Sequence, residues 1–70
     1  MPPKYSVTVM SEDGNQLRSW LATDADDVRE LKRLSRKLKD AKRMRVITFE
    51  TDGLVIEDYK RNFLGFWKKE

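Results

Sequence analysis

The sequence predicts a two-layer α+β domain with the order strand, strand, helix, strand, strand. Two segments alternate apolar and polar residues around a Gly-containing turn, which is typical of β-hairpins. Between them, residues 24–43 contain neither Gly nor Pro and repeat apolar residues every three or four positions, as amphipathic helices do. We therefore expect one domain over residues 1–70, a ββαββ fold whose four-stranded, antiparallel-rich sheet carries the helix across one face.

The first predicted hairpin covers residues 4–22 and follows a disordered start at residues 1–3. Tyr5, Val7 and Val9 alternate with polar residues, so they should share one face of a strand. Residues 11–16 are turn formers, among which Gly14 adopts a positive φ at little cost. The returning strand, residues 17–22, has apolar residues on both faces, which leaves its orientation open.

The predicted helix begins at Thr23 or Asp24, either of which can cap its first turn. Acidic residues crowd the first turns and basic residues the last, an arrangement that the helix dipole favours. The side expected to face the sheet carries an apolar stripe. Its members are Val28, Leu31, Leu34, Leu38 and Ala41.

The second predicted hairpin has strands at residues 45–50 and 54–59 around the turn signal Thr51–Gly53. The connections at both ends of the helix are short. A right-handed crossover would then make the second and third strands parallel to each other. In the alternative arrangement, each hairpin pairs with its counterpart in a second chain.

Composition disfavours catalysis. The chain has no Cys and no His, which removes the usual thiolate and imidazole ligands and the commonest general acid–base group. Asp26, Asp27 and Glu30 suit either a Mg²⁺ site or, more simply, the first turns of a helix. No nucleotide-binding motif is present, so we expect a non-enzyme without a cofactor or metal. With 39% apolar residues the core is thin, which favours a homodimer.

Positive charge is concentrated in one stretch. Residues 29–45 contain nine basic and two acidic residues, a local charge of +7, so the remaining residues carry −4 of the overall +3. We interpret the outer face of the helix as a surface that binds a DNA or RNA backbone without reading bases. A solvated face and an acidic protein partner are the alternatives. The candidate residues are Arg29, Lys32, Arg33, Arg36, Lys37, Lys39, Lys42 and Arg43.

The C-terminal segment, residues 60–70, combines basic and aromatic residues. Its large apolar side chains either complete the core or form a seam for a dimer or protein partner. The same two readings apply to Trp20 and Tyr59, which could lie on the sheet face away from the helix. The candidate interface residues are Trp20, Tyr59, Phe63, Leu64, Phe66 and Trp67.

The sequence therefore predicts a small nucleic-acid-binding module. The alternative is a homodimeric regulatory or inhibitor protein that docks through its aromatic C-terminal segment and an open sheet face. Residues 5–10 and the acidic turn around Gly14 resemble the start of small phage-encoded inhibitors that fold as strand, turn, strand, helix, strand. The positive net charge differs from the DNA-mimicking members of that group. Without an apolar run long enough to cross a bilayer or act as a signal segment, we expect a cytoplasmic protein with no membrane partner.

Overall fold

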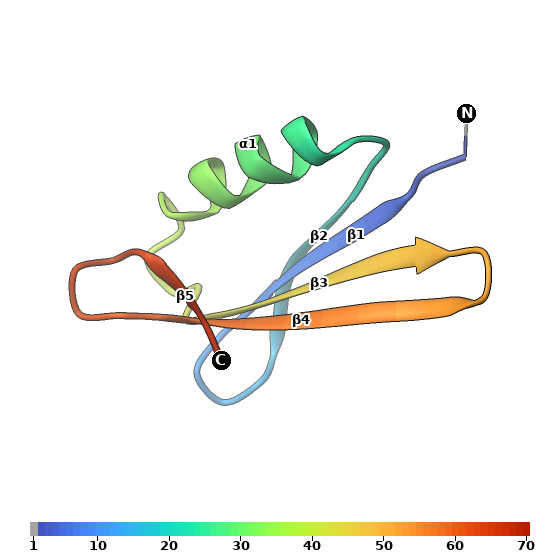
Figure 1. Cartoon of the computed structure of the whole chain (residues 1–70). Coiled ribbons are helices and arrows are strands. Elements are labelled where there is room, and N and C mark those ends of the chain that lie inside the picture. Colours follow the sequence, from blue (N-terminus) through green and yellow to red (C-terminus); the bar gives the residue numbers. More distant parts are fainter. Residues whose placement is uncertain (1) are drawn as a thin grey trace.

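The computed structural model describes residues 2–70 and shows an α+β fold with the element order ββαβββ (Figure 1). Met1, part of the predicted disordered start, lies outside the described residues. The predicted class, with one helix across one face of a sheet, is confirmed, and the sheet gains a fifth strand from the C-terminal segment. The elements are β1 (Tyr5–Met10), β2 (Gln16–Ala22), α1 (Ala25–Ser35), β3 (Arg43–Glu50), β4 (Gly53–Arg61) and β5 (Trp67–Lys69).

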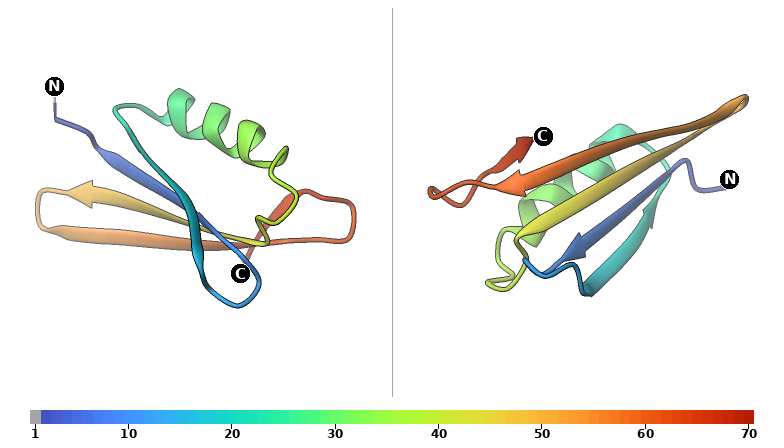
Figure 2. Two further views of the ribbon diagram at one scale, coloured as in Figure 1. Left: turned by 180° about the vertical axis from the view of Figure 1, so that it is seen from behind. Right: turned by 90° about the horizontal axis from the view of Figure 1, so that it is seen from below.

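Every neighbouring pair of strands in the sheet is antiparallel, and the spatial order is β2-β1-β3-β4-β5. Because β1 is antiparallel to both β2 and β3, those two strands run in the same direction, as the short helical crossover predicts. They do not touch, since β1 lies between them. The first strand of the chain is therefore the centre of the sheet, and α1 packs over the β1–β2 side of it (Figure 2).

The core lies between α1 and the sheet. Val7 and Val9 of β1 are fully buried, and they pair across the ladder with Val46 and Met44 of β3. The alternation in β1 thus predicts the buried face correctly. The helix contributes Val28, and the remaining buried apolar residues are Ala22 and Ala41.

The helix ends at Ser35, so the expected helix over residues 24–43 is wrong at its C-terminal end. Its start is as predicted, because the Asp24 carboxylate caps it by accepting from the Asp27 amide at 2.8 Å. After Ser35 the chain makes tight turns whose amides bond three residues back, as in Leu38 N to Ser35 O at 3.0 Å. Leu38 and Ala41 still reach the core, but they do so from these turns.

The turns after α1 are held by Arg61, which lies at the end of β4. Its Nη1 donates to the carbonyls of Leu38 at 2.8 Å and Ala41 at 3.0 Å, and its Nη2 donates to the carbonyl of Arg36. Its Nε donates to the carbonyl of Gly65 at 3.2 Å. One guanidinium therefore satisfies four backbone acceptors that have left regular structure.

The short strand β5 brings Trp67 under the C-terminal end of α1. The indole Nε1 donates to the hydroxyl of Ser35 at 2.9 Å and to the carbonyl of Lys32 at 3.2 Å. Ser35 is fully buried and donates its own proton to the Lys32 carbonyl at 2.8 Å. The C-terminal segment thus contributes a polar contact to the packing beneath the helix, with each buried group paired.

Replacing Arg61 with Ala should destabilise the fold by about 2–3 kcal/mol, because charge-assisted hydrogen bonds to several backbone carbonyls are lost together. Urea unfolding followed by circular dichroism measures the change. Arg18→Ala is the matched control, since Arg18 is an exposed arginine of β2 that makes no side-chain hydrogen bond or ion pair within residues 2–70. Equal stabilities of the two variants would contradict this role for Arg61.

Stability should fall as the pH drops below about 4, because the carboxyl groups of Glu57 and Asp58, like that of Asp13, have lowered pKa values in the folded chain. The hydrogen bond from Arg45 lowers the pKa of Asp58, and the hydrogen bond from Lys69 lowers the pKa of Glu57. A lowered folded-state pKa stabilises above the unfolded-state pKa, and this contribution disappears as these groups protonate. The double variant Asp58→Asn, Glu57→Gln should show a flatter acid limb in thermal melts than the unmodified chain does.

Candidate nucleic-acid interface

The eight predicted nucleic-acid-binding residues do not form one stripe along a helix. Only three of them, Arg29, Lys32 and Arg33, belong to α1. Arg29 pairs with Asp26 at 3.5 Å, and Arg33 pairs with Glu30, so each guanidinium has a carboxylate of its own helix beside it. The middle of the helix is therefore close to neutral on its outer side.

Lys32 points toward the sheet. Its Nζ donates to the Tyr59 hydroxyl at 3.0 Å and lies 4.2 Å from the centre of the Tyr59 ring. This combination of hydrogen bond and cation–π contact keeps the ammonium over β4. Lys32 is half-buried there, and it is not part of an outward basic surface.

Arg43 lies on the other side of the molecule. It is the first residue of β3 and pairs in register with Lys60 of β4, which in turn pairs with Lys68 of β5. Cross-strand partners share a sheet face, so these three cations form a row. Val9 and Met44, one step along their strands, face α1, which puts the row of Arg43, Lys60 and Lys68 on the face away from the helix.

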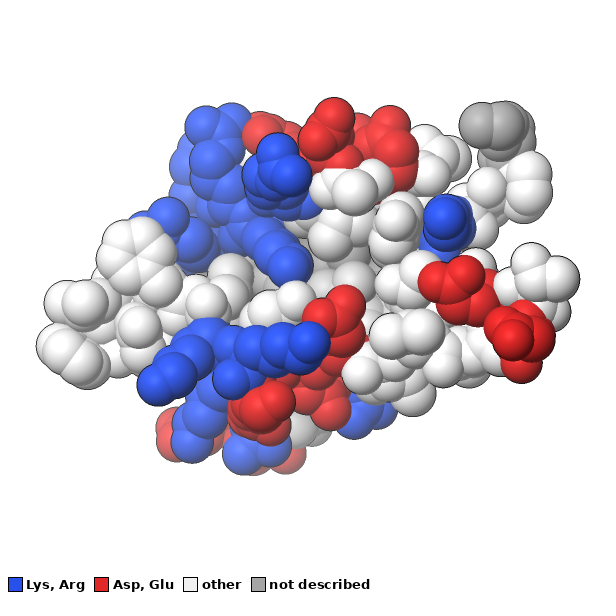
Figure 3. Space-filling view, viewed as in Figure 1, with Lys and Arg blue, Asp and Glu red and all other residues white. Residues whose placement is uncertain are grey.

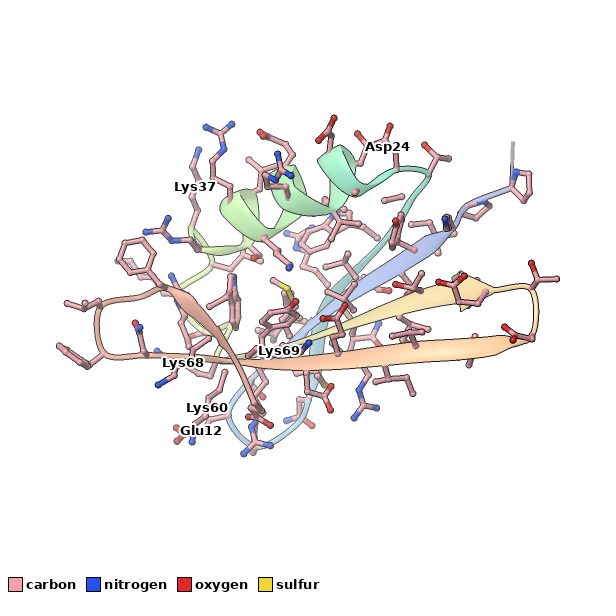
Figure 4. All side chains as sticks on the ribbon, viewed as in Figure 1. Glu12, Asp24, Lys37, Lys60, Lys68 and Lys69 are labelled. Carbon is pink, nitrogen blue, oxygen red and sulfur yellow. The ribbon has the colours of Figure 1, made fainter. Side chains whose placement is uncertain are left out.

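The remaining four cations gather at the end of α1. We call the set Arg36, Lys37, Lys39 and Lys42 the basic corner. All four are exposed, and within residues 2–70 none has a carboxylate within 4.0 Å. Figure 4 shows Lys37 projecting beyond α1 on the side away from the sheet, opposite to Lys60 and Lys68. The corner is thus the largest group of cations without an ion pair in the predicted basic surface, although Lys42 also lines a pocket with Glu12, Asp13 and Asp40.

The turn between β4 and β5 stands beside the basic corner. We call its residues 62–66 the aromatic turn. The Asn62 side-chain oxygen accepts from the amides of Leu64 and Phe66, both at 3.0 Å, and Gly65 takes a φ of 87° that a side chain would strain. These bonds fix the turn internally, so its apolar side chains are presented by a closed loop.

Two aromatic rings of this turn meet the basic corner. The guanidinium of Arg36 lies 4.0 Å from the centre of the Phe66 ring. Phe63 lines a groove of about 420 Å³ together with Lys39 and Lys42. The Phe63 side chain is 95% exposed, so both faces of its ring are open. The fold thus supplies the aromatic groups that the helix sequence itself lacks.

The six predicted interface residues divide into two groups. Trp20, Tyr59 and Trp67 are half-buried and pack against the core from the helix side of the sheet. The alternative that places Trp20 and Tyr59 on the sheet face away from the helix is therefore wrong. Phe63, Leu64 and Phe66 are exposed in the aromatic turn.

Charge is segregated along the molecule, which measures 35 × 20 × 18 Å. In Figure 3, most Lys and Arg side chains lie toward the end that carries the aromatic turn, and Asp and Glu side chains lie at the start of α1 and at the β3–β4 turn. Further Asp and Glu side chains lie among the Lys and Arg side chains on the lower side of the same view. Sequence reasoning missed Lys60 and Lys68 as members of this basic end. Lys60 and Lys68 face each other only because β4 and β5 pair as a hairpin, so the sequence alone could not place them together.

The acidic residues at the start of α1 are engaged with their neighbours. Asp26 and Glu30 pair with arginines, and Asp27 accepts from the Thr23 hydroxyl at 3.4 Å. Within residues 2–70 there is no group of three acidic side chains that could hold a metal ion. The described chain also has no helix with the length and apolar character needed to cross a membrane.

Comparison with protein-family models, with curated proteins and with solved structures found no significant match to this chain. The basic corner and the aromatic turn are therefore the features on which a function can be proposed.

Proposed function

We propose that this protein is a non-enzymatic module that binds single-stranded nucleic acid at the basic corner and the aromatic turn. The observation that carries the proposal is the position of Phe63, an almost fully exposed ring beside Lys39 and Lys42. Exposed aromatic faces next to cations that lack acidic partners are the two components of single-strand binding surfaces.

The cations would contact phosphates. Four cations that each neutralise one phosphate give a slope of log K against log salt of about −3 for a single strand. Arg36 also lies against Phe66, which keeps its guanidinium near the aromatic turn. The corner would bind the backbone without reading the sequence, because phosphate contacts carry no base information.

The exposed ring favours single strands over duplexes. A base stacked on an aromatic side chain contributes about 1–3 kcal/mol, and a base in a duplex is already stacked between its neighbours. The helix does not favour a groove-reading mode, since Arg29 and Arg33 pair with carboxylates and Lys32 faces the sheet. Cations on turns beside a protruding aromatic ring are better suited to a flexible single strand of nucleic acid than to the groove of a rigid duplex.

The charge test uses the double variant Lys37→Glu, Lys39→Glu. Fluorescence anisotropy with a labelled oligothymidine should show loss of at least two phosphate contacts, with the salt slope reduced by about 1.4 or more. The matched control is Arg29→Glu, Arg33→Glu, which makes the same charge change on α1. Equal losses in the two double variants would mean that net charge, and not the basic corner, governs binding.

The stacking test uses Phe63→Ala. Removing one stacking platform should weaken oligothymidine binding about 5- to 150-fold while leaving weak duplex binding unchanged. Leu64→Ala is the control, because Leu64 is an exposed apolar neighbour in the same turn without a π face. If both substitutions have the same effect, or if the unmodified protein binds no DNA or RNA at low salt, the proposal fails.

A further inference from the structure

The sheet has one face that carries no helix in the described chain. Val7 and Val9 point toward α1, so Ser6 and Thr8 and all their cross-strand partners point the other way. We call this surface the open face. Figure 2 (right) views the molecule from this side, with α1 behind the sheet.

The open face is apolar at its centre. Register places Leu21, Ser6, Ile47 and Ile56 in one row across four strands, and Phe49 pairs with Leu54 in the adjoining position. Four of these apolar residues are strongly exposed, with Ile56 at 53%. The residues of β3 and β4 form one apolar cluster, from which Ser6 separates Leu21. An exposed apolar cluster on a small sheet is typical of an interface. The open-face patch consists of Leu21, Ile47, Phe49, Leu54 and Ile56.

Opposite charges flank the patch along the strands. At one end lies the row of Arg43, Lys60 and Lys68. At the other end, the β3–β4 turn carries Asp52, while Glu50, which follows Phe49 on β3, lies on the helix side of the sheet. Ile47 is four residues from Arg43, and its cross-strand partner Ile56 is four residues from Asp52, which corresponds to about 13 Å on either side. Within residues 2–70 these five charged groups form no ion pair with one another or with other residues.

We propose that the occupant of the open face is a second copy of this chain, packed face to face about a two-fold axis that passes near Ile47 and Ile56 and runs across the strands. This axis reverses the strand direction between copies. The acidic turn of one copy then lies over the basic row of the other, at nearly matching distances from the centre. A two-fold axis along the strands would instead place like charges together.

The dimensions fit such a dimer. Four strands span roughly 19 Å, and six residues along a strand about 20 Å. A face of this size has a flat area of about 380 Å² on each copy, so covering it on both copies removes about 760 Å² before the relief of the side chains is counted. This area corresponds to a weak but specific interface. Two sheets would pack about 10 Å apart with their apolar side chains interdigitated. A two-fold interface needs one self-complementary surface. On the open face, Phe49 and Leu54 lie on one side of Ile47 and Ile56, the Arg45–Asp58 ion pair lies on the other side, and opposite charges lie farther out at the two ends.

Light scattering coupled to size-exclusion chromatography tests the interface with two variants of neighbouring residues. The unmodified protein should have twice its 8.3 kDa chain mass at submillimolar concentration. Ile56→Lys should give a folded monomer. Val55→Lys, on the opposite face of the same strand and also exposed (46%), should remain a dimer. Far-UV circular dichroism confirms that both variants fold.

A charge exchange tests the direction of the axis. Lys60→Glu should raise the dimer dissociation constant about tenfold, and adding Asp52→Lys should restore it, because the two positions face each other across the interface. A monomeric unmodified protein, an assembly larger than a dimer, or loss of the dimer with Val55→Lys but not Ile56→Lys would overturn the proposal. Failure of the charge exchange to restore affinity would overturn the proposed axis.

Discussion

The contacts of Arg61 determine how the two halves of the structure meet. After α1 the backbone carbonyls lack helical partners. The guanidinium at the end of β4 donates hydrogen bonds to three of them. Its fourth bond, to Gly65, closes the β4–β5 hairpin. Both the basic corner and the aromatic turn are thus positioned by one side chain. Lys could not replace it, because an ammonium lacks the planar fork that reaches separate acceptors.

The sequence predicts the fold class because local patterns coincide with burial in the strands. Alternation in residues 5–9 identifies the buried face of β1, and the turn residues around Gly14 and Gly53 mark the hairpins. The helix end is missed for a physical reason. Leu38 and Ala41 keep helical spacing and pack into the core, yet the backbone there is held by Arg61, which is 20 or more residues away in the sequence. The periodicity identifies most of the side chains that reach the core, but Leu34 of the same stripe is exposed (43%). The backbone conformation after Ser35 depends on a distant partner that the periodicity does not show.

The candidate site was predictable only in part. The sequence identifies the basic stretch, but it cannot show that Arg29 and Arg33 pair within the helix, that Lys32 turns to Tyr59, or that Arg43 starts a strand on the opposite face. Phe63 lies beside Lys39 because β5 folds back antiparallel to β4, and only three residue pairs form this part of the sheet. Short strands of this kind carry too little pattern to be recognised beforehand.

The separation of charge along the long dimension gives each chain a permanent electric dipole. In the field of an extended polyanion, such a particle rotates before contact so that its positive pole leads. Productive encounters then become a larger fraction of all collisions, and the gain shrinks as added salt shortens the Debye length. An antiparallel pair of such dipoles cancels in the far field. A single chain would therefore be oriented by its dipole as it approaches a polyanion. In the proposed dimer the two dipoles cancel, so attraction would depend chiefly on the local charge of each binding surface.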